Sequence, residues 1–304
     1  MHISEEVRTA IWQNSAKGTI ICHPEKTGGS ALGQFYRDIL NDAYITVNRL
    51  IPRINLAAEK QRLRIENSFV REVNRGSEWA IKLNHQKYST EELLDFPTLT
   101  KILMPYRSIS SRIKSLLAFN YKLYSEMQKS SLIINFENID LISSREIPVD
   151  AYSGQKLLIE DSEKPKFKYK DLELFAADSF YSNIIESEKY LSLLEKGEIE
   201  VFLDGIKSNY FLYENNLGDL LSRNEISKLQ LERITFIEMA DLDLFMFGIH
   251  GKHLPKVNKS NYSLLPKLLR EKIESKDFEE EIKHRFPNEF FIEKELKARL
   301  WRAK

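Results

Sequence analysis

Several features that would assign a function at once are scarce or missing in this chain of 304 residues. It has one cysteine, Cys22, which excludes an intramolecular disulfide framework and suits a reducing compartment. The 45 basic and 45 acidic residues cancel, so the chain lacks the basic excess of nucleic-acid and membrane-surface binders. No run approaches the roughly 20 apolar residues that cross a bilayer, and residues 1–7 lack the cationic and apolar segments of a signal peptide. We therefore expect a soluble cytoplasmic protein with no membrane span and no nucleic-acid partner.

The familiar catalytic and cofactor motifs are missing as well. The sequence has no G-x-x-x-x-G-K-[ST] nucleotide loop, no G-x-G-x-x-G and no G-x-S-x-G nucleophile elbow. His250 and His253 have an H-x-x-H spacing, but no cluster of cysteines or carboxylates accompanies them as in a zinc site. Cys22 lies in an apolar run, which indicates a buried hydrophobe rather than a nucleophile. We expect no metal cofactor.

What the chain does contain is a glycine-rich junction between a predicted strand and a predicted helix. Residues 18–23 form a short run that is rich in β-branched and apolar side chains, and residues 31–40 place apolar side chains at helical spacing. The junction consists of Lys26, Thr27, Gly28, Gly29 and Ser30. Two adjacent glycines let backbone N–H groups converge on an anion at a helix N-terminus, while the hydroxyls and the lysine add donors and charge. The pattern predicts an anion cradle; an ordinary strand-to-helix turn with a solvated lysine is the alternative.

A second strand-to-helix junction follows about 80 residues later. Residues 99–105 form an apolar run that predicts a strand, and Ser108 is suited to cap the helix after it. Arg107, Arg112 and Ser115 have the chemistry to bind a phosphate, because an arginine fork matches phosphate oxygens and a serine hydroxyl completes the shell. A solvated helix face would show the same spacing.

One histidine lies between the two junctions at the end of a further predicted strand. Residues 79–84 alternate as a strand does, and His85 follows directly. An imidazole has an unperturbed pKa near neutrality, so it is suited to accept a proton from a hydroxyl. His85 is our candidate for a general base, with His23 as a second candidate and a surface or capping role as the alternative.

Together these segments resemble the sulfotransferases that use 3′-phosphoadenosine-5′-phosphosulfate (PAPS), notably the carbohydrate enzymes related to heparan sulfate 2-O-sulfotransferase. Those enzymes read His-Ile-Pro-Lys-Thr-Gly-Gly-Thr at the first junction, where this chain has His-Pro-Glu-Lys-Thr-Gly-Gly-Ser, with Glu25 before the lysine. At the second junction they read Arg-Asp-Pro-x-x-Arg-x-x-Ser, and here Ser108 and Ile109 replace the Asp-Pro. The resemblance covers residues 18–40 and 78–118.

The resemblance implies a P-loop-like three-layer α/β sandwich with a central parallel sheet, and we expect a largely helical C-terminal half. It implies transfer of a sulfuryl group from PAPS to a hydroxyl-bearing acceptor, with a carbohydrate expected, and no metal. By this resemblance His85 is the base and Lys26 neutralises the leaving phosphate. The donor-binding residues implied are Lys26, Thr27, Gly28, Gly29, Ser30, Arg107 and Ser115. Two other functions stay open: a nucleotide-dependent kinase, and a non-catalytic glycan-binding relative.

The layout of the chain indicates one sulfotransferase-like domain over residues 1–304. We expect a donor-binding core over about 15–130 and 232–262, an acceptor region of helices and loops over about 140–231, and a charged helical tail over 263–304. Helices are predicted over 108–129, 171–194 and 224–231, and a late strand over 234–238. In the tail we expect Phe290, Phe291, Leu296 and Leu300 to dock. Eukaryotic relatives of this type are usually anchored in the Golgi by an N-terminal membrane helix, and no such helix is seen in this sequence. A bacterial cytoplasmic enzyme is therefore expected, or a Golgi luminal one if the chain is part of a longer eukaryotic protein.

Overall fold

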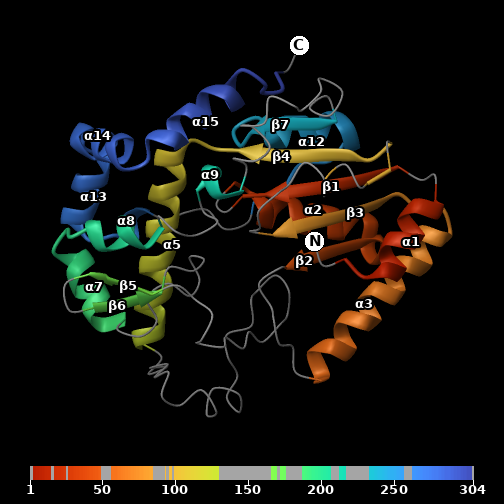
Figure 1. Ribbon diagram of the computed structural model, residues 1–304, viewed down its shortest axis with the longest axis horizontal. Helices are drawn as coiled ribbons and strands as arrows, with labels where there is room; N and C mark the ends of the chain where they lie inside the picture. The colour runs from red at the N-terminus through yellow and green to blue at the C-terminus, as the bar shows by residue number, and fades with distance from the viewer. Residues whose placement is uncertain are drawn as a thin grey trace.

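The fold is built on a five-stranded sheet in which all strands are parallel, in the order β2-β3-β1-β4-β7 (Figure 1). The computed structural model describes residues 3–14, 17–24, 27–48, 56–84, 93, 96–97, 99–129, 166–169, 172–175, 187–206, 212–216, 233–256 and 262–302. The strands of the sheet are β1 (Gly18–His23), β2 (Tyr44–Asn48), β3 (Trp79–Asn84), β4 (Lys101–Tyr106) and β7 (Ile234–Glu238). The strands predicted over 18–23, 79–84, 99–105 and 234–238 are therefore confirmed.

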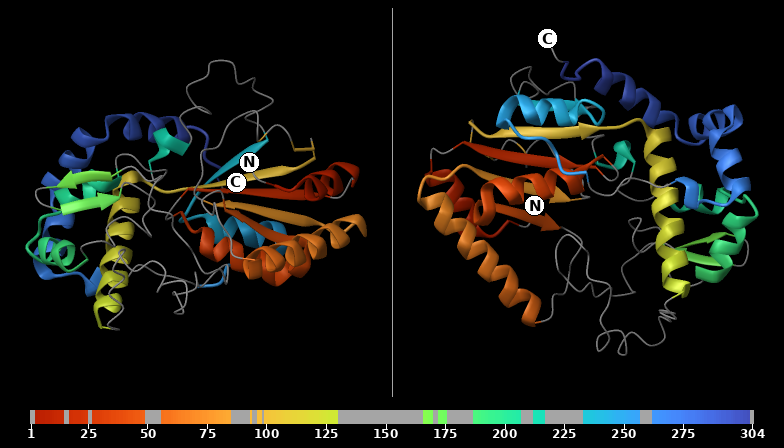
Figure 2. Two further views of the ribbon diagram at one scale, coloured as in Figure 1. Left: turned by 60° about the horizontal axis from the view of Figure 1, so that its bottom comes forward. Right: turned by 180° about the vertical axis from the view of Figure 1, so that it is seen from behind.

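Helices cover both faces of this sheet, which makes the three layers that the sequence analysis predicted. One face packs against α1 (Glu5–Gln13), α3 (Leu56–Asn74) and α15 (Pro287–Lys297). The other packs against α2 (Gly29–Leu40) and α12 (Leu242–His250), with the 3-10 turn η1 (Asn41–Ala43) leading from α2 into β2. The right-hand view of Figure 2 shows α2 and α12 in front of the strands. The protein therefore has an α/β fold with helices on both faces of a parallel sheet.

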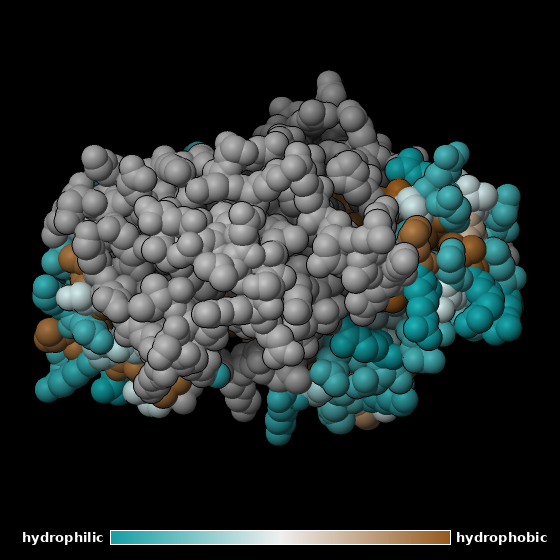
Figure 3. Space-filling view, turned by 90° about the horizontal axis from the view of Figure 1, so that it is seen from below, coloured by the Kyte–Doolittle hydropathy of each residue, from teal (hydrophilic) through white to brown (hydrophobic). Residues whose placement is uncertain are grey.

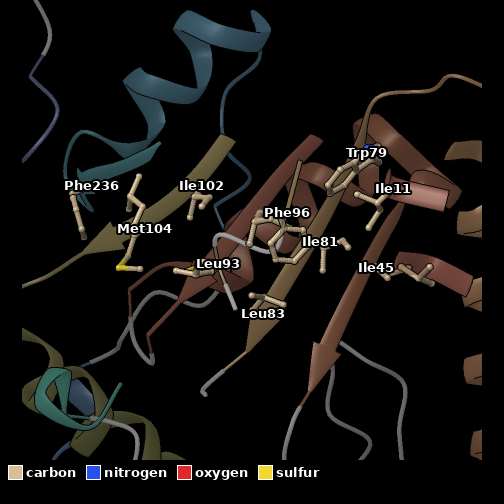
Figure 4. Packing of buried hydrophobic residues seen from close by; sticks show 14 of the residues in the cluster. Ile11, Ile45, Trp79, Ile81, Leu83, Leu93, Phe96, Ile102, Met104 and Phe236 are labelled. Carbon is tan, nitrogen blue, oxygen red and sulfur yellow. The ribbon is translucent and has the colours of Figure 1, made fainter. Parts of the chain in front are cut away.

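Alternation of side chains explains how each strand serves both layers. In β3, Ile81 and Leu83 belong to the core beneath α1 and α3, whereas Ala80 belongs to the core beneath α2. Figure 4 shows the first of these cores, in which Ile81 and Leu83 lie near Leu93 and Phe96. Strands buried on both faces read as nearly continuous apolar runs, which is why they could be recognised in the sequence.

The order of the strands creates a switch point between β1 and β4. These two neighbours are hydrogen-bonded in parallel, with Ile20 opposite Ile102. The chain leaves β1 through α2 toward β2 on one side, and leaves β4 toward β7 on the other. Turns that diverge in this way leave a crevice at the carboxyl ends of the strands, where open α/β sheets bind ligands.

A second core lies beside the sheet, around the long helix α5 (Ile109–Lys129) (Figure 1). Helices α7 (Ser187–Glu195), α8 (Glu200–Ile206), α13 (Lys267–Glu274) and α14 (Lys276–Arg285) pack around it, with the 3-10 turn η4 (Tyr262–Leu264). The helix predicted over 108–129 is thus present. Its apolar residues Ile113, Leu116 and Leu117 belong to this helical core rather than to the clusters that cover the sheet.

The prediction of one helix over 171–194 is wrong at residues 172–175. These residues form strand β6 (Leu172–Phe175), which pairs antiparallel with β5 (Lys166–Tyr169), while α7 (Ser187–Glu195) covers the end of the predicted range and residues 171 and 176–186 lie outside the described residues. The sequence Leu-Glu-Leu-Phe has the two-residue period of a strand. The short helix α9 (Tyr213–Asn216) follows α8 in the described part of the chain, and the predicted helix over 224–231 lies outside the described residues.

The last described segment returns from the helical core to the edge of the sheet. Leu296 is buried against the sheet, and Leu300 forms a parallel bridge with Phe236 of β7. The Trp301 backbone N–H donates to the Phe236 carbonyl at 2.7 Å, and its ring contacts Phe245 at 5.0 Å between centroids. Residues 287–301 therefore help to build the core, which is more than the docking tail that the sequence suggested. Phe291, expected to dock, is 63 % exposed, so that prediction is wrong.

The molecular surface is mixed in character. On the face shown in Figure 3, the coloured residues are mostly hydrophilic, with hydrophobic ones scattered among them. Scattered exposed apolar side chains are usual on folded proteins. Among the described residues, no helix has the length and apolar character that a membrane span requires.

Candidate functional site

The first glycine-rich junction forms a tight turn from β1 into α2. Gly28 has the left-handed backbone angles φ 85° and ψ 11° and caps α2, and its carbonyl accepts from the Leu32 N–H at 3.2 Å. Only glycine adopts these angles without strain. The first turn of α2 carries no acidic residue, so the positive end of its dipole faces no carboxylate from its own helix. Such an N-terminus suits an anion.

His23 shapes this turn from the end of β1. The ring is buried, and its Nδ1 lies 3.2 Å from the Thr27 hydroxyl, which donates to the Pro24 carbonyl at 2.5 Å. Because that hydroxyl gives its one proton to Pro24, it accepts from His23, which places the ring proton on Nδ1. Thr27, expected to offer its hydroxyl to an anion, instead uses it to close the turn, and His23, the second candidate for the base, has a structural partner here.

The second junction leads from β4 into α5. Ser108 caps the helix, as predicted: its hydroxyl accepts from the Ser111 N–H at 3.4 Å. Arg107 lies between strand and helix and is half-buried, with its Nη2 3.4 Å from the Tyr262 hydroxyl. Ser115, expected to share a phosphate with Arg107, is buried at 3 % exposure two turns into α5.

A buried polar cluster supports this second junction, and of its residues the sequence analysis named only Arg112, as one suited to bind a phosphate. The Arg112 guanidinium is fully buried and lies 4.0 Å above the ring of Tyr213. The carboxylate of Glu289 accepts from the backbone N–H groups of Tyr213 at 2.9 Å and Glu214 at 2.7 Å. Burial raises the pKa of Glu289 to about 7, and the positive charge of Arg112 opposes that rise. Buried charges of this kind are stable only when paired.

The predicted site residues that the structure describes converge on one edge of the sheet. Gly28, Gly29 and Ser30 follow β1, and Arg107 follows the neighbouring strand β4. Asn84, the last residue of β3, pairs in register with His23, so β3 ends at the same edge of the sheet. Lys26 and His85 themselves lie outside the described residues.

A buried cation beneath α2 is a further residue that the sequence analysis missed. Lys82 of β3 is 5 % exposed, and its Nζ would lie 3.2 Å from a Cβ placed on Gly33 of α2. The only sequence indication is a lysine between two apolar strand residues. Tyr213 and Glu289 have less local signature still, because their partners lie far away in the chain.

The H-x-x-H pair has separate partners. The His253 Nδ1 lies 2.9 Å from an oxygen of Asp243, and the ring of His250 packs on Phe35 and Tyr36. Burial lowers the pKa of His250. Within the part of the chain that the structure describes, no three His, Cys, Asp or Glu residues gather as a metal site would require.

Comparison with known protein families, with curated proteins and with solved structures finds no match to this chain. Any statement on function therefore depends on the chemistry of the two junctions.

Proposed function

We propose that this protein is a sulfotransferase that moves a sulfuryl group from PAPS to a hydroxyl of a carbohydrate acceptor. The observation that supports the proposal most is the adjacency of β1 and β4 at the switch point of the sheet. It brings the glycine turn and Arg107, which lie about 80 residues apart in the chain, to neighbouring strands at the carboxyl edge of the sheet, where open α/β sheets bind ligands. The two groups suit two anionic ends of one donor.

In this proposal the 5′-phosphosulfate lies at the N-terminus of α2. The left-handed backbone of Gly28 begins α2, whose free N–H groups would bind the anion, and Lys26 would supply a mobile charge. Arg107 binds the 3′-phosphate with its planar fork of donors. Ser115 would add a hydroxyl donor to the 3′-phosphate, which requires the phosphate to reach the buried side of α5.

The reaction is a displacement at sulfur. The acceptor oxygen forms a new bond to sulfur as the bond between sulfur and the 5′-phosphate oxygen breaks. His85 takes the proton of the attacking hydroxyl, and 3′-phosphoadenosine-5′-phosphate (PAP) leaves with the bonding electrons, its charge neutralised by Lys26. Catalysis then consists of positioning and electrostatic stabilisation, as in phosphoryl transfer.

Calorimetric titration with PAP, adenosine 5′-phosphate and Mg²⁺-ATP tests the donor site. We expect PAP to bind at least about tenfold more tightly than adenosine 5′-phosphate, a difference of about 1.4 kcal/mol, and Arg107→Ala to remove that preference. The matched control is Arg75→Ala, because Arg75 is exposed, is paired with Glu72 at 2.7 Å and precedes β3 at the opposite edge of the sheet. Failure to bind PAP, or a preference for Mg²⁺-ATP, would overturn the proposal and favour a kinase.

Recognition of the 3′-phosphate without sulfuryl transfer would bear on the remaining alternative, a non-catalytic glycan-binding relative. If PAP binds with its 3′-phosphate recognised and PAPS transfers no sulfuryl group to any of a panel of glycans, the protein is a non-catalytic relative or has a different acceptor. Radiolabelled PAPS with a wider panel of hydroxyl compounds distinguishes these two outcomes, because label transferred to any of them shows a catalytic site with a different acceptor.

A further inference from the structure

Arg107 lies at a point where the backbone leaves a strand and has not yet entered a helix. Strand β4 ends at Tyr106 and helix α5 begins at Ile109. The hydroxyl of Tyr213 bonds both polar backbone groups of Arg107: it accepts from the N–H at 3.0 Å and donates to the carbonyl at 2.7 Å. The Tyr213 hydroxyl thus satisfies both backbone hydrogen-bonding groups of Arg107, as a neighbouring strand would.

Tyr213 is itself held on every side. It is fully buried, its ring stacks on Tyr106 at 6.0 Å and 19°, and the Arg112 guanidinium covers the ring at 4.0 Å. Its backbone N–H is bonded by the Glu289 carboxylate at 2.9 Å. A side chain fixed at its backbone, its ring and its hydroxyl has little freedom to move, so the position of its oxygen is well defined.

The next residues of the junction are held by the same helix, α15. The Glu293 carboxylate accepts from the Ile109 N–H at the start of α5, and Glu289 lies one turn before it on α15. A carboxylate at a helix N-terminus satisfies a free donor and complements the dipole. The backbone from Tyr106 to Ile109 is therefore fixed by two side chains that come more than 100 residues later.

We propose that Tyr213 is the positioning residue for Arg107 and that it sets the affinity of the site for the 3′-phosphate of the donor. This inference rests on the proposed function. A guanidinium on a fixed backbone keeps its fork aimed without the ordering cost that a loose loop would add on binding. Tyr213 contacts no reacting atom in this assignment, so it acts only through Arg107.

The test is Tyr213→Phe, which keeps the stacked ring and removes the hydroxyl. Tyr121→Phe is the matched control, because the Tyr121 hydroxyl bonds Glu195 at 3.3 Å and Tyr121 lies 12 residues after Ile109, the first residue of α5, a rise of about 18 Å along the helix. We expect Tyr213→Phe to weaken PAP binding about tenfold and to leave adenosine 5′-phosphate binding within about twofold. In an Arg107→Ala background the same change should have no further effect on PAP. Thermal melting of each variant confirms that it is folded.

A general loss of structure would weaken both nucleotides equally, so equal losses overturn the proposal. It is also overturned if Tyr213→Phe binds PAP like the wild type, or if its effect persists without Arg107. Amide hydrogen exchange at Arg107, measured without ligand, separates this inference from the proposed function. If the wild type fails to recognise the 3′-phosphate, the sulfotransferase assignment fails. Faster exchange at Arg107 in Tyr213→Phe than in Tyr121→Phe then still supports Tyr213 as the residue that holds Arg107, and unchanged exchange overturns that as well.

Discussion

The imidazole of His23 occupies the space that a side chain at position 29 would need. A Cβ placed on Gly29 would lie 1.9 Å from the His23 Cδ2 and 2.1 Å from its Nε2. The two adjacent glycines of the turn are thus required for different reasons: Gly28 for its left-handed backbone, and Gly29 for the space beside the ring. A His at the strand end and a Gly at the helix start form one structural unit.

Replacing Gly29 therefore tests this unit. We expect Gly29→Ala to lower the free energy of unfolding by about 1–3 kcal/mol, because the methyl group overpacks the turn. In a His23→Ala background the same substitution should cost little, since the space is then empty. Urea denaturation of the four proteins gives the coupling energy.

Gly248→Ala serves as the control for this cycle. A Cβ at Gly248 in α12 meets no atom within 4 Å, so alanine there should stabilise by roughly 0.5–1 kcal/mol through helix propensity alone. If the effects of Gly29→Ala and His23→Ala simply add, the two residues do not compete for the same space.

The buried carboxyl of Glu289 predicts a dependence of stability on pH. Burial raises its pKa to about 7 in the folded protein, with Arg112 opposing the rise, whereas an exposed glutamic acid has a pKa of about 4.3. The folded state therefore binds this proton more tightly than the unfolded state. The resulting penalty is absent below about pH 4, grows as the pH rises and is complete above about pH 7.

Replacing Glu289 by Gln should remove this dependence of the free energy of unfolding on pH. The free energy of unfolding of the wild type should fall relative to Glu289→Gln between pH 5 and 7, by up to about 1.4 kcal/mol per pH unit. The variant has a lower stability overall, because an amide cannot accept from both backbone N–H groups that Glu289 bonds. Denaturant titrations at four pH values measure the slopes, with exposed Glu280→Gln as the control. Parallel curves would contradict the prediction.

Trp301 should contribute to the stability of the sheet although it lies in the last described segment. Its ring packs edge-on against Phe245, and its backbone bonds Phe236 at the edge of β7. We expect Trp301→Ala to cost about 1–3 kcal/mol. Trp12→Ala, whose ring is 53 % exposed, should cost less than about 0.5 kcal/mol. Equal losses for the two variants would show that the contact of the Trp301 ring with Phe245 is unimportant for stability.

His85 is predicted to act in turnover and not in donor binding. We expect His85→Ala to lower the rate of sulfuryl transfer by about 10²–10⁴-fold, the usual contribution of a general base, with PAP affinity nearly unchanged. His284→Ala, an exposed histidine on α14, should retain full activity. Transfer at the wild-type rate in His85→Ala would exclude this residue as the base.

The strands β1, β3, β4 and β7 could be predicted because each is a local signal, whereas β2 (Tyr44–Asn48) was not predicted. Residues 18–23 and 79–84 read as apolar runs with the strand period, and both strands have the predicted bounds. The two junctions could be predicted for the same reason, because a glycine pair after a strand has only a few local uses. Nothing in the sequence near Arg107 points to Tyr213, which is 106 residues away, or near Ile109 to Glu293, which is 184 residues away.

The apolar face of α5 has helical spacing whichever core it enters, so only the fold shows that it builds the helical core. The error over residues 172–175 has the same origin. The segment from Leu172 to Phe175 is too short to distinguish strand from helix among charged neighbours, and its partner strand β5 decides it. Tertiary contacts outweigh local propensity in such short segments.

The dependence of Arg107 on α15 has a consequence for how the protein is made. A chain that grows from its N-terminus has both strands β1 and β4 available to pair once residue 106 has left the ribosome, and the glycine turn lies between these two strands in the chain. The backbone at Arg107 finds its partners only after residues 213, 289 and 293 have been synthesised. In a nascent chain the glycine turn would thus be synthesised long before the residues that fix the backbone at Arg107, and that backbone would be ordered only in the finished polypeptide.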